Sequence, residues 1–283
     1  IKDELNDKMV LSEQPRSQYS IVFEGTNFIR NNPNCMIPVK SRREVELLLL
    51  ILREEVNVIM NEQARELYPD IWQWLNGLTY SDVFASLKWT YREEEEVLDL
   101  IERIPLPASL EKSFIQLYRD QPEAEPIDQR YVHKQNQECV LLSKPYQCGN
   151  MFYFNGFKRS AEFNIDHDSD HLEGIIIFEA ARQAGIASTH LTGIPLSGAI
   201  VTLKTTVRYN KFVECNEPYI IRTIPVIKQK GGCSYGVYQV IQKGVSCATG
   251  YFTGMVYKSR EMYDKFRNSK AIAKVANEKV VGM

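Results

Sequence analysis

The chain has little of what marks several large classes of protein. Its longest apolar runs, residues 45–52 and 174–185, are far shorter than the roughly 20 residues that span a bilayer, so no membrane-spanning helix is expected. The first residues have no basic region followed by an apolar stretch, so no signal peptide is expected either. The formal net charge of -2, from 34 basic and 36 acidic residues, gives no electrostatic basis for binding nucleic acid or an anionic membrane.

Cysteine pairs and common catalytic motifs are also lacking. The six cysteines are thinly spread and form no C-x-x-C pair, which favours reduced thiols in a cytoplasmic protein. No G-x-S-x-G sequence is present, so a serine hydrolase of that type has no support. The K-G-G sequence at 230–232 is better explained as a turn than as a phosphate loop. What the chain does have is 44% hydrophobic residues, enough for one large core or two smaller ones.

The first half of the chain has helical apolar spacing. The spacing runs over residues 41–120 and begins with the capping box of Ser41 and Glu44, although residues 19–25 favour a strand. A linker is predicted after it, where two prolines and three acids fall within nine residues. We therefore expect a mainly helical N-terminal domain of unknown role over residues 1–128.

The second half combines one helix with several strands. A long apolar helix is predicted over residues 174–190, and the strands expected after it are 198–209, 219–227, 234–242 and 245–257. One apolar helix followed by an antiparallel meander predicts an α+β domain over 129–258, with the sheet wrapped around the helix. A final polar helix is expected from about 259 to 274, within a tail that ends at 283.

Glu179 is the lone acid of that apolar helix. A carboxylate in a buried helix costs free energy unless it is paired or lines a cavity. Arg182 and Gln183 follow it by three and four residues, close to the same face. Two interpretations stay open: a buried Glu179–Arg182 pair that orients the helix, or a general base in an acyl pocket with a pKa tuned by burial.

The loop before the helix concentrates ionisable groups, namely Asp166, His167, Asp168, Asp170 and His171. Asp170 is well placed to cap the helix N-terminus, where negative charge is favoured. Gly174 allows close approach to the first-turn N–H groups, which can hold a thioester carbonyl or an oxyanion. Capping and loop hydrogen bonds are favoured for the two histidines over a metal site, because no H-E-x-x-H helix or distant third ligand is evident. His190, at the helix end, is interpreted as a partner of the helix dipole.

Two motifs resemble the A-factor biosynthesis hotdog family. The first is V-H-K at 132–134 with V-L-L-S at 140–143, and the second is D-H-x-x-D-H followed by Gly174 and E-A-A-R-Q-A. They stand in the family's order and spacing, and the resemblance covers about residues 130–258. The second motif is also more distantly similar to hotdog β-hydroxyacyl carrier protein dehydratases. The resemblance implies a hotdog fold, a sheet around a long helix.

The resemblance also implies a reaction and a site. The reaction would transfer a β-ketoacyl group from an acyl carrier protein thioester to a hydroxyl acceptor such as dihydroxyacetone phosphate, in the synthesis of γ-butyrolactone-type signals or other secondary metabolites. Gly174 would hold the carbonyl, and Glu179 would act as general base or orient the acceptor. The site would further contain His171 and Asp170 as catalytic residues and Arg182, Gln183, His167 and Asp166 as substrate-binding residues. No metal or organic cofactor is implied, because phosphopantetheine on a carrier protein or coenzyme A carries the acyl group.

Basic residues after the helix are further candidates for the site. Lys204, Arg208 and Lys211 would suit a phosphorylated acceptor or a phosphopantetheine arm, with ordinary exposed strand charge as the alternative. Glu173 departs from the family motif, which usually has proline there. Typical members also have two hotdog halves in tandem, whereas this N-terminal half is predicted to be helical. Because a lone hotdog normally pairs with a second, a homodimer through this domain is expected.

Other functions remain open at this point. The same Glu179 would serve thioester hydrolysis or β-hydroxyacyl dehydration. A non-catalytic module that holds an acyl chain or a carrier protein, with the N-terminal half contacting a partner, is the alternative from a different class.

Overall fold

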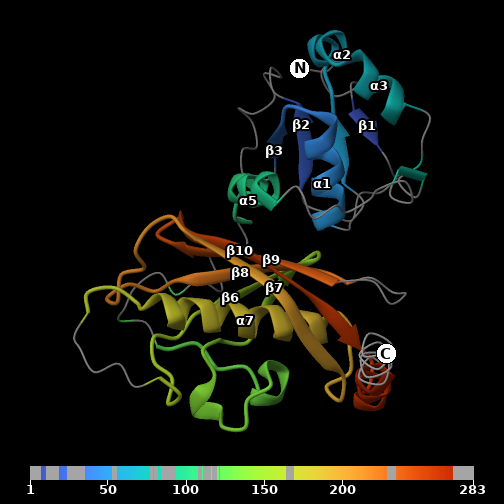
Figure 1. Cartoon of the computed structure of the whole chain (residues 1–283). Coiled ribbons are helices and arrows are strands. Elements are labelled where there is room, and N and C mark those ends of the chain that lie inside the picture. The colour runs from blue at the N-terminus through green and yellow to red at the C-terminus, as the bar shows by residue number, and fades with distance from the viewer. Residues whose placement is uncertain are drawn as a thin grey trace, which may run out of the picture.

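The computed structural model describes residues 8–10, 19–23, 36–52, 56–76, 79, 82–83, 94–107, 110, 116, 120, 122–163, 169–227 and 234–269. They form a four-stranded sheet in the N-terminal half and a six-stranded sheet in the C-terminal half (Figure 1). Within these residues no helix has both the length and the apolar character needed to cross a membrane.

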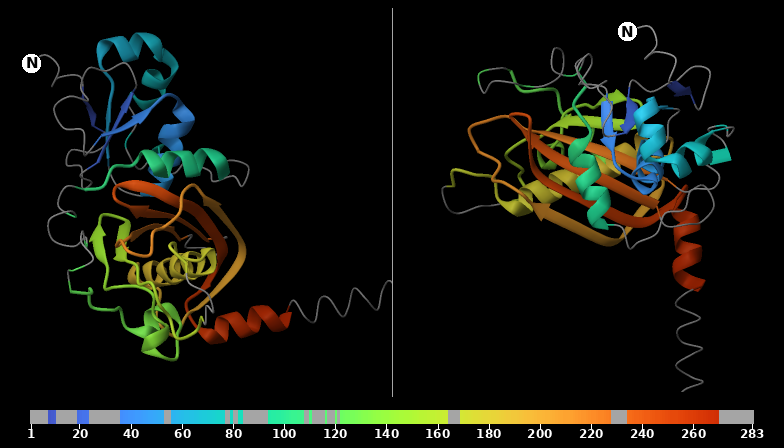
Figure 2. Two further views of the ribbon diagram at one scale, coloured as in Figure 1. Left: turned by 90° about the vertical axis from the view of Figure 1, so that its left-hand side faces the viewer. Right: turned by 90° about the horizontal axis from the view of Figure 1, so that it is seen from above.

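The C-terminal half is a sheet curved around one helix. The helix is α7 (Gly174–Leu191), and the strands are β5 (Tyr146–Cys148), β6 (Met151–Asn155), β7 (Ala199–Tyr209), β8 (Ile220–Val226), β9 (Ser234–Gln242) and β10 (Val245–Tyr257). The strand order is β5-β6-β8-β9-β10-β7, with every pairing antiparallel. Seen from the side, the strands wrap around α7 (Figure 2). This confirms the hotdog fold that the sequence predicts.

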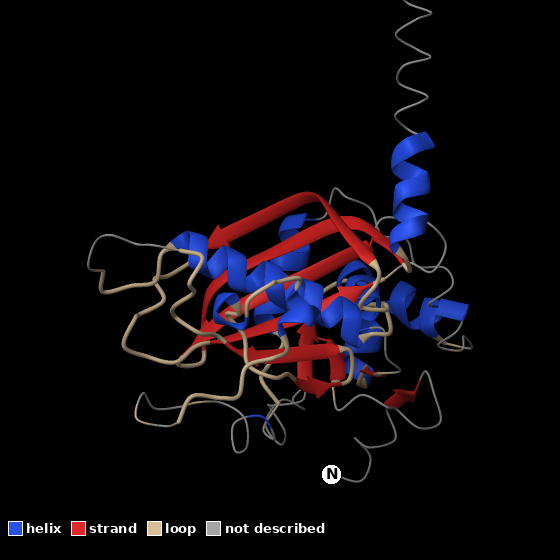
Figure 3. Ribbon diagram, turned by 90° about the horizontal axis from the view of Figure 1, so that it is seen from below, coloured by secondary structure: helices blue, strands red, loops and turns tan. Residues whose placement is uncertain are grey.

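Small side chains on α7 let the sheet approach it closely. Ala180, Ala181 and Ala184 are fully buried and pack with Phe154 and Tyr238 of the inner sheet face in one apolar cluster. The segment over residues 122–145 lies on the side of α7 that the sheet leaves open (Figures 1 and 3). Because α7 is covered from both sides, nearly all of its middle is buried, as the sequence pattern predicts.

One predicted hairpin turn is confirmed. Lys243 and Gly244, between β9 and β10, both have positive φ, 51° and 72°. Positive φ at both central residues is what a two-residue type I′ turn requires. The other predicted turn, at residues 231–232, lies outside the described residues, as does the part of the predicted final helix beyond the observed helical residues 260–269.

The N-terminal half differs from the mainly helical domain that the sequence predicts. Its helices are α1 (Arg42–Leu52), α2 (Glu62–Leu67), α3 (Pro69–Leu75) and α5 (Glu94–Arg103), and its strands are β1 (Lys8–Val10), β2 (Ser20–Phe23), β3 (Met36–Val39) and β4 (Asn57–Ile59). The strand order is β1-β4-β2-β3, and β2 runs parallel to both β3 and β4. Strand β4 lies within residues 41–120, which the sequence predicts to be helical, because its short apolar run pairs with the buried strand β2.

The two halves share an apolar core over the outer face of the six-stranded sheet. Buried residues of α1 and α5 belong to the same cluster as Ile224 of β8 and Val237 of β9. Arg222 of β8 is completely buried, and its guanidinium donates to the carbonyls of Ile101 (2.6 Å) and Ile104 (2.8 Å) at the end of α5. A cation suits this position, because the carbonyl end of a helix carries partial negative charge.

Candidate functional site

The two sequence motifs meet across α7. Segment 129–143 contains the short helices η4 (Gln129–Val132) and η5 (Gln137–Cys139). The fully buried Gln183 amide accepts from the Leu141 N–H (2.9 Å) and donates to the Cys139 carbonyl (3.0 Å). Lys134 Nζ lies 2.8 Å from Glu179 Oε1. Residues separated by more than forty positions are thus joined through one helix face.

Glu179 is held by two cations and an amide. The Arg182 guanidinium donates to both carboxylate oxygens at 2.7 Å, which is the pair expected from the spacing, and Gln183 Nε2 donates at 3.1 Å. Burial raises the pKa of the Glu179 carboxyl, but the hydrogen bonds from Arg182 and Lys134 outweigh it, and the pKa falls to about 2. A carboxylate with so low a pKa is a weak general base at neutral pH. The geometry therefore suits Glu179 to fixing charge and orientation.

A histidine pair connects the first motif to the far end of α7. His133 Nε2 lies 2.8 Å from His190 Nε2, and His190 Nδ1 lies 3.0 Å from the Ile194 carbonyl. Because only an N–H can donate to that carbonyl, the His190 tautomer with its proton on Nδ1 accepts at Nε2, and His133 donates. Burial, together with His190 and Arg182, lowers the pKa of His133. Sequence reasoning missed this contact, although His133 stands within the first motif.

The sequence suggests that Asp170 caps the N-terminus of α7, and this prediction is wrong. The residue in the N-cap position is Glu173, and its side chain makes no capping hydrogen bond. Asp170 lies further out, where its carboxylate accepts from His171 Nδ1 at 2.8 Å. The hydrogen bond from His171 lowers the pKa of Asp170. With Nδ1 donating to a carboxylate, His171 Nε2 is left as a proton acceptor.

A cavity of about 640 Å³ opens beside this helix end. His171, Leu172, Gly174 and Ile177 line one side, and residues 209–214 line the other. The Tyr209 hydroxyl donates to the Gly174 carbonyl at 2.8 Å, and Phe212, which is 70% exposed, packs on His171 with ring centroids 4.5 Å apart. The volume of this cavity falls within the range of small-molecule sites.

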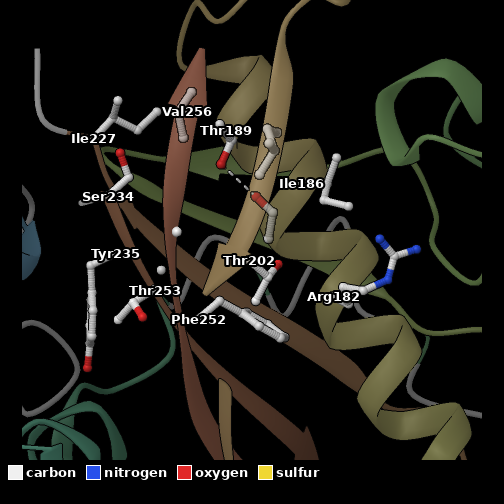
Figure 4. Close-up of a pocket in the computed structure, with 14 residues that line it drawn as sticks. Arg182, Ile186, Thr189, Thr202, Ile227, Ser234, Tyr235, Phe252, Thr253 and Val256 are labelled. Carbon is white, nitrogen blue, oxygen red and sulfur yellow. Dashed lines mark hydrogen bonds between the residues drawn. The ribbon is translucent and has the colours of Figure 1, made fainter. Parts of the chain in front are cut away.

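A second, much smaller cavity lies between the middle of α7 and strands β7, β9 and β10 (Figure 4). Its volume is about 50 Å³, and its wall is mainly apolar, with Gly185, Ile186 and Phe252 among its lining residues. Arg182 lines it too, but its guanidinium points away from the strands (Figure 4), toward the pair with Glu179.

The predicted site residues therefore divide into separate places. Gly174 and His171 line the larger cavity, whereas Glu179 and Gln183 belong to the ion-pair cluster on segment 129–143. Residues 166–168, which include Asp166 and His167, lie outside the described residues.

The predicted basic residues face different surroundings. Lys204 Nζ lies 5.6 Å from the ring centre of Tyr251, and Arg208 pairs with Asp99 (2.8 Å) and Glu95 of α5. Neither lines the larger cavity, whereas Lys211 does. In the part of the chain that the structure describes, no three histidine, cysteine or acidic side chains are grouped to hold a metal ion.

A six-stranded antiparallel sheet curved around one long helix defines a hotdog protein. The family model of the A-factor biosynthesis hotdog domain matches residues 115–258, about half of the chain, and the chain belongs to this family. The match begins before the predicted linker at 121–129. A search of curated protein sequences finds no match.

Several solved structures are similar over the hotdog region. A protein from Streptococcus mutans bound to acetyl-CoA is 16% identical, with a TM-score of 0.30, and the match covers 39% of this chain and 84% of that one. A hypothetical thioesterase from Streptococcus pneumoniae, solved with coenzyme A, is 17% identical, with a TM-score of 0.31 and coverage of 39% and 81%. An uncharacterized protein from Pyrococcus horikoshii is 18% identical, with a TM-score of 0.34 and coverage of 48% and 95%.

Proposed function

We propose that this protein is an enzyme that transfers an acyl group from a thioester to a hydroxyl acceptor, in the cavity at the N-terminus of α7. One observation carries the proposal: the cavity joins a helix N-terminus without a side-chain cap to a histidine held by a carboxylate. Such a helix end stabilises an oxyanion, and a carboxylate-held imidazole accepts a proton. Membership of the A-factor biosynthesis hotdog family supports the same reaction class.

The proposed reaction uses two groups of the cavity. The thioester carbonyl oxygen is placed against the first-turn N–H groups at Gly174, where the positive end of α7 stabilises the developing negative charge. The oxygen of the acceptor hydroxyl bonds to the thioester carbon while His171 Nε2 takes the hydroxyl proton. When the C–S bond breaks, the same proton passes to the leaving thiolate. Asp170 keeps the His171 ring oriented throughout.

The substrate is proposed to be a β-ketoacyl thioester carried on phosphopantetheine of an acyl carrier protein or on coenzyme A. A hydroxyl acceptor with a phosphate, such as dihydroxyacetone phosphate, fits the one lysine among the lining residues, Lys211. No metal or organic cofactor takes part in this proposal. The free cysteines among the described residues, such as Cys139 and Cys247, support a cytoplasmic location.

Glu179 takes a positioning role in this proposal. Its carboxylate, held by Lys134 and Arg182, ties α7 to segment 129–143 and so fixes the axis along which the helix N-terminus points. The alternative, in which Glu179 is itself the general base, requires a much higher pKa than its partners allow.

The site is proposed to act within a homodimer formed along β7. This strand is the last in its sheet, and no described strand pairs with its outer edge. It is eleven residues long, and Leu203 on it is 61% exposed. A long exposed edge strand is a template for pairing with another chain, and a second copy supplies an identical edge.

The test is incubation with a β-ketoacyl carrier protein, with and without dihydroxyacetone phosphate, followed by mass spectrometry. We expect an acyl ester of the acceptor, and His171→Ala should slow its formation roughly 100-fold or more. Asp264→Asn, on the exposed C-terminal helix, is the control and should leave the rate unchanged. Thioester loss that ignores the acceptor would identify a hydrolase instead, and retention of the thioester without turnover would identify a binding module.

A further inference from the structure

Helix α5 of the N-terminal half contacts the end of β7 through side chains. Arg208 pairs with Asp99 at 2.8 Å and also with Glu95. Two residues further on, the Asn210 amide donates to Glu102 Oε1 at 2.6 Å. Glu102 also accepts from the Thr249 hydroxyl of β10 at 3.3 Å. These contacts join the N-terminal half to one short stretch of the hotdog sheet.

That stretch forms a wall of the cavity at the N-terminus of α7. Tyr209 and Asn210 both line the cavity, and the Tyr209 hydroxyl reaches the Gly174 carbonyl. Burial raises the pKa of Tyr209, so its phenol remains a donor. Phe212 continues the wall and packs on the His171 ring. Side chains alternate along a strand, so Arg208 faces α5 while Tyr209 faces α7. Asn210 follows directly after β7, and its amide donates to Glu102 of α5.

Hydrogen bonds from the hotdog sheet hold α5 in place. The buried Arg222 guanidinium donates to the carbonyls of Ile101, Ile104 and Pro105 where α5 ends. Gln239 of β9 accepts from the same guanidinium. A buried charge with several oriented acceptors admits few alternative geometries, so α5 can serve as a fixed support. Backbone bonds from Asn210 and Lys211 to the Cys247 carbonyl hold the same wall from the side of β10.

We propose that Asp99 and Glu102 of α5 are positioning residues for the cavity. They hold the end of β7 where Tyr209 meets Gly174 and Phe212 meets His171. The N-terminal half is then part of the site's architecture, and whatever displaces α5 also displaces the groups that would hold the acceptor. The cavity's importance rests on the proposed function, but its dependence on α5 does not.

The test uses the four histidines of the full chain as probes. The NMR signal of the His171 ring Cε1–H group depends on the Phe212 ring packed against it. His171→Gln identifies that signal in an NMR spectrum of ¹³C-histidine-labelled protein. Asp99→Ala/Glu102→Ala should shift the His171 signal without ligand. The signals of His133 and His190 should stay unchanged, because α7 separates His190 from its N-terminus by about 24 Å. These two signals also report that the variant is folded.

Two further variants make the result specific. Asp99→Asn/Glu102→Gln keeps oxygen acceptors for Arg208 and Asn210 and should restore the His171 signal. Glu96→Ala removes an exposed acid of the same helix and should leave it in place. With a β-ketoacyl carrier protein, the double alanine variant should lose roughly 3- to 10-fold in kcat/KM, the range of a coupling through packed groups.

An unchanged His171 signal in the folded double alanine variant would overturn the inference, as would an equal shift in Glu96→Ala. A shifted signal supports the inference even if the wild-type protein turns over no thioester. The two proposals therefore fail independently.

Discussion

Glu179 illustrates how the partners of one residue decide what it does. Its side chain is only 10% exposed, and Lys134 and Arg182 compensate its charge. Glu179→Gln keeps the shape but leaves the two cations without their anion, so it should lower the free energy of unfolding at pH 7 by roughly 2–3 kcal/mol. Urea unfolding measures this. Glu66→Gln, on the exposed face of α2, is the control and should change it by less than about 0.5 kcal/mol.

The effect of Glu179→Gln on the free energy of unfolding should depend on pH. The pKa of Glu179 lies below its usual value of 4.5, at about 2, so its contribution to stability is complete above pH 4.5 and is lost as pH falls toward 2. That contribution is at most about 3 kcal/mol, and the difference between wild type and Glu179→Gln should narrow over this range. Abolished turnover with unchanged stability would contradict the positioning role and favour a general base.

At the scale of elements, the start of α7 depends on the end of β7. Tyr209→Phe removes the hydroxyl that donates to the Gly174 carbonyl, a bond worth about 0.5–1.5 kcal/mol. We expect faster amide hydrogen exchange in the first turn of α7 and little change elsewhere, measured on peptides by mass spectrometry. Tyr263→Phe is the control. Among the described residues, the Tyr263 ring packs against the Tyr257 ring and the Arg260 guanidinium, both far from α7 in the sequence. Unchanged exchange at the first turn in Tyr209→Phe would show that β7 does not support it.

At the scale of the whole molecule, Arg222 joins the two halves. Arg222→Met fills similar space but leaves buried carbonyls of α5 without a donor, which should lower the free energy of unfolding by roughly 2–4 kcal/mol. All three tryptophans lie before residue 90, so their fluorescence follows the N-terminal half alone. We expect fluorescence and far-ultraviolet circular dichroism to give one unfolding midpoint in the wild type.

In Arg222→Met the fluorescence midpoint should come at lower denaturant than the circular dichroism midpoint. Arg159→Met, at an exposed position without a described contact, should behave like the wild type. Coincident midpoints in Arg222→Met at unchanged stability would show that Arg222 does not join the two halves.

The sequence predicted the hotdog half well but not the other. The α7 pattern and the four later strands were evident because a buried helix and a meander leave long periodic signals. Strand β4 was missed because three residues, Asn57–Ile59, carry no period of their own and became a strand by pairing with β2 and β1. The site was predicted as one constellation, yet Gly174 and Glu179 are five residues apart, about 140° around the helix axis, and so face different surroundings.

What the sequence determined by itself was local: a buried helix, a glycine at its start, a carboxylate next to a histidine, and an acid with an arginine one turn on. Each follows from residues close in the chain, where helix geometry determines which side chains can contact each other. Only the tertiary structure decided the rest. It brought Lys134 to Glu179 and His133 to His190, and it placed α5 behind the cavity wall, because those contacts join distant segments whose pairing depends on how the sheet curves around α7.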